Sequence, residues 1–391
     1  MKKIRPLIIT FFALSLVVGV TLRKSSRTAS AAANRSVLQA AKHDPVLILP
    51  SSTITVNSTA QSPGIVGDCT LGEAIQAANT EAAVDGCNAG SGTDTIILPA
   101  GTYTLLTNDA SFPAAGLPAI TSDIVIQGTG AASTIIERSA GAASQFRLLA
   151  VSNPNSGSLV LNDVTLRGGR SDDKGGALYL ARTTTLNNVV FTDNTAPNGG
   201  GAILGPDFGD SRPVTINNCT FDNNRATNYY GGAIYGPIVT VNNSTFTNNQ
   251  AANGGGAIFY AQSAGARFTI TDSTFINNVA ANNGGAVLST GITTVVGSLF
   301  DNNTAGSQGG AISAGYALDI RSSVVTNNHA NEKAGIAREP VPTGLGGGFE
   351  SLVVDRCTIS HNVSNRTSGG VYVESGSASI TNSTISGNIA A

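Results

Sequence analysis

The stretch TVNNSTFTNN, from Thr240 to Asn249, followed by GGAI from Gly255 to Ile258, decides the fold of this chain of 391 residues. It contains short runs of β-branched and aromatic residues, separated by Asn-Asn and Gly-Gly pairs, and it shows no helical periodicity. Phe246 precedes Asn249 by three residues. Eight successive segments repeat this spacing of a large apolar residue and an asparagine, at Phe191/Asn194, Phe221/Asn224, Phe246/Asn249, Phe275/Asn278, Phe300/Asn303, Val325/Asn328, Ile359/Asn362 and Ile385/Asn388.

The apolar residues of these segments recur 25 to 34 residues apart when Leu166 is counted as the first. Internal repetition at such a period indicates a solenoid, propeller or array, and the strand-like runs exclude leucine-rich and helical solenoids. One coil of a right-handed parallel β-helix needs about this many residues for three short strands and three turns. We therefore expect an all-β fold, a single right-handed parallel β-helix over 93–391, with about eleven or twelve coils along roughly 55 Å.

The alternation within a coil predicts which side chains point into the core. Val241, Ser244 and Phe246 would point inward, with a bend at Asn242-Asn243 that keeps the alternation in phase. The repeated asparagine is expected to form a structural ladder, because stacked amides can donate to one neighbouring coil and accept from the other. The Gly-Gly pairs would supply positive φ or a close approach of two backbones at a corner.

A sequence of a different kind precedes the repeats. The segment CTLGEAIQAAN, from Cys69 to Asn79, predicts a short amphipathic helix over 70–79 with Thr70 as its N-cap and Glu73 completing a capping box. A solenoid needs an atypical end that covers its open core. We expect residues 53–92 to form this N-terminal cap, with the helix as its lid, and residues 32–52 to be a linker.

The four cysteines divide into two groups. Cys69 and Cys87 flank the predicted helix and are expected to form a disulfide, which in the chain-entropy model stabilises by about 3 kcal/mol. Cys219 and Cys357 occupy the same inward column, five coils or about 24 Å apart, whereas a disulfide needs Cα atoms within roughly 7 Å. These two are expected to be free and buried.

The first 31 residues have the pattern of an export signal. A basic start is followed by an uncharged segment from Pro6 to Leu22 and then by small residues, which predicts either a cleaved secretory signal peptide or an uncleaved signal anchor. The expected location is therefore secreted, extracellular or at the cell surface, with membrane contact only through such an anchor. Removal of 1–31 would change the charged residues from 22 basic and 24 acidic to 16 and 24, a net charge of −8. An acidic chain without basic clusters argues against a nucleic-acid partner.

The segment from Thr53 to Leu105 resembles the CSLREA domain found at the start of many bacterial secreted right-handed β-helix proteins. Its motif here is Cys69-Thr70-Leu71-Gly72-Glu73-Ala74, so Thr70 replaces a serine and keeps the cap, while Gly72 replaces an arginine and loses its role. The Gly-Gly-Ala-Ile and Phe-x-x-Asn repeats are similar to the passenger repeats of chlamydial polymorphic outer-membrane proteins. That resemblance implies surface display or adhesion.

Residues that could support catalysis are scattered along the chain. Carbohydrate-cleaving β-helices place acidic and basic residues from neighbouring coils on one lateral face. The candidates here are Asp172, Asp173 and Lys174, for which a solvated turn is the alternative interpretation. The three histidines, His43, His329 and His361, form no recurring motif, and no calcium nonapeptide repeat is present. The sequence predicts no cofactor and no metal site.

Two insertions interrupt the coil length, at 205–213 and at 329–346. Insertions in solenoids emerge as lateral loops and often form the binding face. The second insertion, with His329, Glu332, Lys333, Arg338 and Glu339, is the predicted binding segment, and a tolerated surface excursion is the alternative.

The sequence stops directly after the Asn388 turn, which predicts an uncapped end, either of a fragment of a longer protein or of a coil covered by a partner. Exposed strand edges there would favour end-to-end self-association. The expected function is structural or adhesive, in contact with carbohydrate or another polymer of a host or cell surface. The alternative is a polysaccharide lyase or glycoside hydrolase, and the fold alone cannot decide between them.

Overall fold

The computed structural model describes residues 51–61, 66–112, 114–152, 157–206, 212–236, 240–262, 266–339 and 351–391. The chain divides into two units, Met1–Leu47 and Ile48–Ala391, and the structure below is that of the second. The predicted signal segment, most of the predicted linker and His43 lie outside the described residues.

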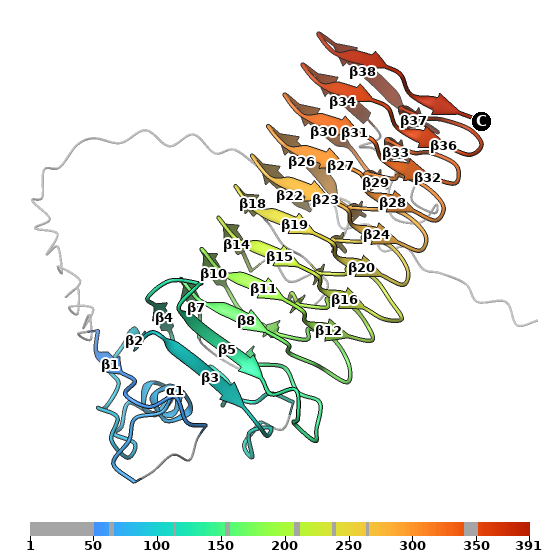
Figure 1. Ribbon diagram of the computed structural model, residues 1–391. Coiled ribbons are helices and arrows are strands. Elements are labelled where there is room, and N and C mark those ends of the chain that lie inside the picture. Colours follow the sequence, from blue (N-terminus) through green and yellow to red (C-terminus); the bar gives the residue numbers. More distant parts are fainter. Residues whose placement is uncertain are drawn as a thin grey trace, which may run out of the picture. The chain divides into compact units, whose positions relative to one another are not determined.

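From Thr53 onward the chain forms a parallel β-helix, in which the strands of each sheet stack in sequence order (Figure 1). A twelve-stranded sheet contains β1 (Thr53–Thr55), β2 (Asp94–Leu98), β4 (Ile124–Gly128), β7 (Leu159–Asn162), β10 (Thr184–Asn187), β14 (Val214–Asn217), β18 (Thr240–Asn242), β22 (Arg267–Thr271), β26 (Ile292–Val296), β30 (Leu318–Arg321), β34 (Ser351–Asp355) and β38 (Ser377–Thr381). An eleven-stranded sheet contains β3 (Gly101–Leu105), β5 (Thr134–Arg138), β8 (Thr165–Arg167), β11 (Val190–Thr192), β15 (Thr220–Asp222), β19 (Thr245–Thr247), β23 (Thr274–Ile276), β27 (Leu299–Asp301), β31 (Val324–Thr326), β35 (Thr358–Ser360) and β39 (Thr384–Ser386).

Two further sheets complete each coil. An eight-stranded sheet of two-residue strands contains β12 (Thr195–Ala196), β16 (Arg225–Ala226), β20 (Gln250–Ala251), β24 (Val279–Ala280), β28 (Thr304–Ala305), β32 (His329–Ala330), β36 (Val363–Ser364) and β40 (Ile389–Ala390). A nine-stranded sheet contains β6 (Leu149–Val151), β9 (Leu178–Leu180), β13 (Ile203–Leu204), β17 (Ile234–Tyr235), β21 (Ile258–Tyr260), β25 (Val287–Ser289), β29 (Ile312–Ala314), β33 (Ile336–Arg338) and β37 (Val371–Val373). The expectation of three strands per coil was wrong. In each of these coils, two residues that follow the ladder asparagine pair with the neighbouring coils and form a fourth short strand before the Gly-Gly corner.

The coil that contains Phe246 shows how the sequence produces this path. Asn243 and Asn248 adopt positive φ, of 44° and 57°, at the ends of β18 and β19, a conformation that asparagine tolerates better than most residues. At the next corner, Gly255 has φ 66°. A Cβ on Gly256 would overlap the carbonyl oxygen of Gly285 in the next coil. The first glycine of the pair therefore permits the turn and the second permits the close approach.

The inward columns form one continuous core. Val241, Ser244 and Phe246 are buried, as the alternation predicted. The rings of Phe191, Phe221, Phe246, Phe275 and Phe300 stack in parallel with centroids 4.6 to 4.7 Å apart. This spacing equals the distance between adjacent hydrogen-bonded strands, so the rings stay in contact from coil to coil.

The asparagine ladder is buried and saturated. Asn224 donates its backbone N–H and its Nδ2 group to Oδ1 of Asn249 in the next coil, at 3.0 Å each. Its Nδ2 group also donates to the carbonyl oxygen of Phe191 in the preceding coil, at 3.0 Å. Its own Oδ1 accepts the backbone N–H and the Nδ2 group of Asn194. Each such amide thus links three coils, as predicted for a structural ladder.

The same ladder continues to the end of the stack. Each Nδ2 group donates to Oδ1 of the next member at 2.9 to 3.0 Å, in the order Asn249, Asn278, Asn303, Asn328, Asn362 and Asn388. The members from Asn194 to Asn362 are fully buried, whereas Asn388, in the last coil, is half-buried. All eight asparagines of the sequence column therefore belong to one ladder, which meets solvent at its last member.

A second amide ladder lies on the outer side of the twelve-stranded sheet. Asn187 donates to Asn162, Asn217 to Asn187, and Asn242 to Asn217, at 2.8 to 2.9 Å between Nδ2 and Oδ1. These side chains are half-buried. The outer ladder lacks the backbone hydrogen bonds that anchor the inner one.

The N-terminal end of the stack is covered by helix α1 (Leu71–Thr80), which packs beside β1 and β2 (Figure 1). The expected capping box is present, since Thr70 Oγ1 accepts the backbone N–H of Glu73 at 3.3 Å and Glu73 accepts the N–H of Thr70 at 2.9 Å. Ala74, Ile75 and Ala78 are buried in the core. The expected disulfide joins Cys69 and Cys87, whose Cα atoms are 4.7 Å apart.

The last coil of the described residues is uncovered. Ile380 and Ile385, which continue inward columns, are each 45% exposed. Within the described residues, no helix combines the length and the apolar character needed to cross a membrane.

Candidate functional site

The predicted catalytic residues lie on the turn between β8 and β9. Asp173 accepts a hydrogen bond from Asn198 Nδ2 at 3.0 Å and donates its backbone N–H to Ser171 Oγ at 3.1 Å. Lys174 places Nζ 5.1 Å from the ring centroid of Tyr235. Asp173 and Lys174 therefore hold the turn in place, and Asp172 is the member of the trio that lines a cavity.

That cavity has a volume of about 570 Å³ on the lateral surface. It is lined by Gln145, Arg170, Ser171, Asp172, Thr195, Pro197, Arg225 and Thr227. A second cavity of about 400 Å³ shares Arg170, and a third of about 120 Å³ shares Arg225. The three together are called the lateral groove here. The first and third follow the outer side of the eight-stranded sheet across successive coils, whereas the second lies beside β5 and β8 of the eleven-stranded sheet.

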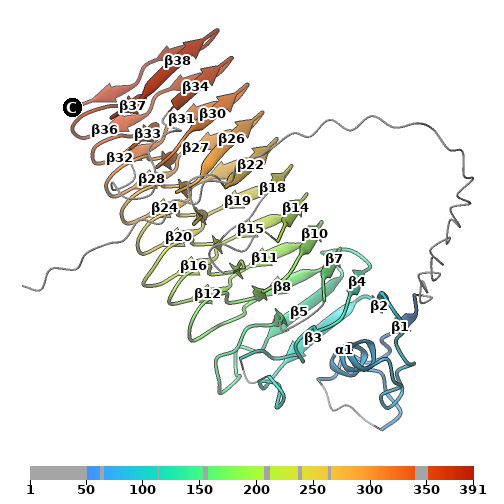
Figure 2. The ribbon, with the colours of Figure 1, turned by 180° about the vertical axis from the view of Figure 1, so that it is seen from behind.

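The eight-stranded sheet gives the groove its wall. Its short strands lie one above another along one side of the stack (Figure 2). The outward positions, in register, are Arg170, Thr195, Arg225, Gln250, Val279, Thr304 and His329. The inward residue of each strand from β12 to β32 is an alanine. The inner side is thus uniform, whereas the outer side changes from coil to coil.

Positive charge is concentrated at one end of this wall. Arg170 and Arg225 are exposed, and neither guanidinium makes a hydrogen bond or ion pair with the described part of the chain. The neighbouring Arg167 differs, because it forms an ion pair with Glu137 at 2.5 Å. Burial and the positive charge of Arg170 both lower the pKa of the Arg138 guanidinium. The two unpaired guanidiniums therefore add positive charge to the groove, whose carboxylates are Asp172 in the first cavity and Glu137 and Asp193 in the second.

Arg147 lies buried beneath the same groove. Its Nη2 group donates to Ser171 Oγ at 3.3 Å and to the carbonyl oxygen of Lys174 at 3.0 Å, and its guanidinium lies 5.3 Å from the Tyr179 ring centroid. Burial lowers the pKa of Arg147, against the favourable charge of Asp173. Arg147 thereby fixes the turn that presents Arg170 and Asp172.

The sequence interpretation did not single out Arg170 or Arg225. The available signal was the register, since Arg225 directly follows the ladder residue Asn224 and Arg170 follows Leu166 by the same four residues that separate Arg225 from Phe221. Aligning the coils on the ladder places both arginines in one outward column.

The asparagines of the inner ladder take no part in the groove or in any other surface site of the described residues. Asn278, Asn303, Asn328 and Asn362 are fully buried. Besides its bond to the next amide, each of their Nδ2 groups donates at 2.9 to 3.0 Å to a carbonyl oxygen of the preceding coil, that of Phe246, Phe275, Phe300 or Val325. A buried amide whose groups are all used cannot meet a ligand, which agrees with the structural role predicted for this column.

The predicted binding segment is not a loop over its first part, which corrects the expectation for 329–346. His329 belongs to β32 and pairs with Thr304 and Val363, and Arg338 ends β33. The coil therefore continues through 329–339, and the remaining residues of the expected loop, 340–346, lie outside the described residues.

The charged side chains of this segment contact one another. Lys333 is buried, with Nζ 2.6 Å from Glu339 Oε1 and 3.9 Å from the Tyr372 ring centroid. Glu332 accepts from Gln308 Nε2 at 3.0 Å. Arg338 is fully buried and donates to Ser375. His329 remains exposed on the same outward column as Arg225.

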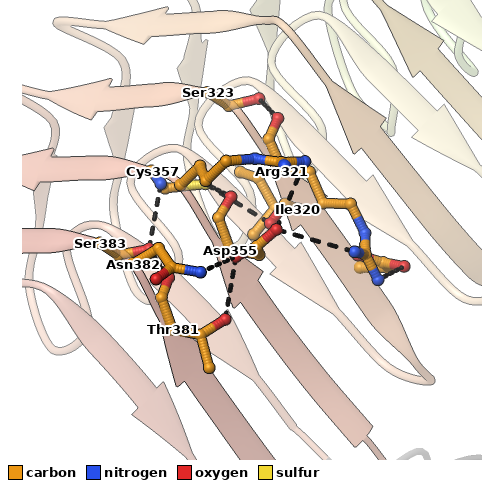
Figure 3. Close-up of polar contacts among 10 residues, drawn as sticks. Ile320, Arg321, Ser323, Asp355, Cys357, Thr381, Asn382 and Ser383 are labelled. Atoms are coloured by element: carbon orange, nitrogen blue, oxygen red, sulfur yellow. Dashed lines mark hydrogen bonds and ion pairs between the residues drawn. The ribbon is translucent and has the colours of Figure 1, made fainter.

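A second polar cluster lies on the outer side of β30, β34 and β38 (Figure 3). Asp355 accepts hydrogen bonds from Thr381 Oγ1 at 2.9 Å and Asn382 Nδ2 at 3.0 Å. These bonds, with the nearby Arg356 and Arg321, lower the pKa of Asp355. Because each charged group here already has partners, the cluster is a structural network.

Cys219 and Cys357 are free and buried, as expected. Each occupies a position where other coils have serine, and the backbone N–H of each donates to the serine of the next coil, Ser244 or Ser383, at 3.0 Å. Burial raises the pKa of Cys219 to about 12 and also raises that of Cys357. Thiolate chemistry is therefore suppressed at both positions. In the described part of the chain, no three His, Cys, Asp or Glu residues are grouped as a metal site would require.

Comparisons with known proteins agree with the architecture. The family model described as a right handed beta helix region matches residues 150–305, and the model of the Chlamydia polymorphic membrane protein repeat matches residues 297–315. Among solved structures, the A-module of a mannuronan C-5 epimerase from Azotobacter vinelandii aligns with 82% of this chain and 91% of its own, at 14% identity and a TM-score of 0.43. No curated protein matches the sequence. The family model over residues 150–305 and the order of the strands confirm the right-handed parallel β-helix, and the CSLREA resemblance stays a prediction.

Proposed function

We propose that this β-helix is an extracellular or cell-surface scaffold that holds a carbohydrate polymer along its lateral groove, in a structural or adhesive role. The observation that carries the proposal is the groove itself, which runs across successive coils beside two arginines that have no partner within the described residues. An elongated groove suits an extended chain better than a compact small molecule. The Cys69–Cys87 disulfide supports an oxidising compartment.

The alternative, cleavage of the polymer, has less support. Hydrolysis of a glycosidic bond ordinarily requires two carboxyl groups that flank it. In the cavity of about 570 Å³, Asp172 is the one carboxylate among the described residues of the lining, and Asp173 beside it is hydrogen-bonded to Asn198 of the next coil. In the adjoining cavity of about 400 Å³, Glu137 is already paired with Arg167 and Asp193 accepts a hydrogen bond from Asn223. The groove therefore resembles a binding surface more than a catalytic one.

A glycan-array assay with the full chain tests the proposal, run beside assays for new reducing ends and for unsaturated products. We expect binding without turnover. Arg225→Ala and His329→Ala make a matched pair, because both residues are exposed on the same outward column. Loss of binding in Arg225→Ala alone would support the lateral groove as the binding site. Loss of binding in His329→Ala alone would support the segment 329–346 that the sequence predicted. Failure to bind any glycan would exclude the proposal, and product formation abolished by Asp172→Asn would establish an enzyme instead.

A further inference from the structure

The two free arginines of the groove stand in a fixed register. Arg170 pairs with Thr195, and Thr195 pairs with Arg225, as successive outward positions of three coils. Coils are separated by about 4.8 Å, so the Cα atoms of the two arginines are roughly 10 Å apart along the stack. An uncharged threonine lies between them. Positive charge is therefore presented on alternate coils.

From this register we infer that the groove binds an acidic polysaccharide that runs along the stacking direction and places carboxylates opposite Arg170 and Arg225. This inference rests on the proposed function and names the ligand class. One disaccharide of an extended chain has about the length of two coils, so the ligand would present one carboxylate per disaccharide on the bound face. Arginine suits this role because its planar guanidinium can donate two parallel hydrogen bonds to a carboxylate.

The other lining groups favour a sugar acid over other polyanions. Asp172, Gln145 and Thr227 are positioned around the same cavity as Arg170 and Arg225, and their oxygens can accept hydrogen bonds from hydroxyl groups. Asp172 would repel a densely charged phosphate chain. Nucleic acids are bound by many closely spaced cations, often with stacked aromatic rings, and this chain has an excess of acidic residues.

The acid-binding part of the groove ends at Arg225. The next outward residues are Gln250, Val279 and Thr304, none of which is charged. Sugars beyond Arg225 would therefore meet a neutral wall. The shortest fragment that reaches both arginines is one disaccharide plus the next acidic sugar.

The test measures binding of hyaluronan, in which a uronic acid alternates with a neutral sugar, to the full chain by calorimetry. Carboxyl-reduced hyaluronan and dextran serve as uncharged comparisons. We expect carboxyl reduction to weaken binding at least tenfold, and Arg170→Ala and Arg225→Ala each to weaken it about five- to tenfold. His329→Ala should bind as the unaltered protein does. Thermal unfolding of each variant checks that the fold is retained.

A register-shift variant separates spacing from charge. Thr195→Arg combined with Arg225→Ala keeps two arginines and the same net charge but places them on adjacent coils. We expect it to bind hyaluronan no better than Arg225→Ala. Affinity equal to that of the unaltered protein would show that the spacing of the two arginines does not matter and would overturn the proposed register. Equal binding of the carboxyl-reduced polymer would show that the ligand need not be acidic, while leaving the proposed function intact. Tighter binding of single-stranded DNA than of hyaluronan would overturn the sugar-acid assignment, and binding of no glycan at all would overturn the proposed function as well.

Discussion

Asn224 and Arg225 are neighbours in the chain, yet they belong to two regions that obey different rules. Asn224 is fully buried in the inner ladder, and its side-chain amide bonds to the coils on both sides. Arg225 points outward into the lateral groove and has no partner among the described residues. The inner column repeats because every coil has the same buried turn, whose polar groups need the same hydrogen bonds. The outer column varies because water can hydrogen-bond to exposed side chains of any kind. Residues for binding can therefore be placed in the outer column without disturbing the fold.

The largest effect should come from breaking the inner column. Asn224→Ala would leave the carbonyl oxygen of Phe191, the backbone N–H of Asn194 and Oδ1 of Asn249 with fewer partners in a buried turn. Unsatisfied buried groups cost about 1–3 kcal/mol each, partly relieved by water, so we expect a loss on the order of 3–4 kcal/mol. Denaturant unfolding followed by circular dichroism measures it. A loss below about 1 kcal/mol would show that the ladder is not a principal source of stability.

A second way to disturb the interior is to raise the pH. Burial raises the pKa of Cys219 to about 12 in the folded protein, whereas a thiol in an unfolded chain has a pKa of about 8.5. The unfolded state therefore loses its proton first, and the contribution of Cys219 to stability, present below about pH 8.5, is lost as the pH rises toward 12. At pH 10 the loss would be about 2 kcal/mol.

Cys219→Ser supplies the control for this pH dependence. Serine is the residue at the equivalent position of later coils, where Ser244 Oγ donates to the carbonyl oxygen of Asn242 at 2.7 Å. The variant should therefore retain most of its stability at pH 7 and lose less than the unaltered protein at pH 10. Iodoacetamide should label Cys219 in denaturant but not in the native protein. Rapid labelling of native Cys219 at pH 8 would contradict its raised pKa.

The outer amide ladder gives a smaller effect and sharpens the contrast with the inner one. Asn217 lies in the same coil as Asn224, seven residues earlier, and its Nδ2 group donates to Asn187 Oδ1 at 2.9 Å. Because the amide is half-exposed, water can replace the lost bonds. We expect Asn217→Ala to cost less than about 1 kcal/mol in the same unfolding assay. A cost equal to that of Asn224→Ala would mean that burial does not separate the two ladders.

The same contrast explains what could be predicted from sequence. The period, the inner ladder, the glycine corners and the Thr70 capping box arise from interactions that repeat or that are local, so they leave a pattern in the sequence. The groove depends on which outward residues from different coils share a column, and Arg170 and Arg225 form no pattern by themselves. Residues 329–339 were wrongly assigned to an inserted loop, because the length of a coil shows that residues are inserted but not at which position in the coil.

Arg225→Ala should have the smallest effect on stability and therefore tests the contrast most directly. The guanidinium makes no hydrogen bond or ion pair with the described residues, and the backbone N–H of Arg225, which donates to the carbonyl oxygen of Asn194 at 2.9 Å, is kept in the variant. We expect the free energy of unfolding to change by less than about 0.5 kcal/mol. A loss above about 1 kcal/mol would mean that the Arg225 side chain stabilises the fold. The inner column could then not be assigned to stability and the outer column to binding at the position where the two columns adjoin.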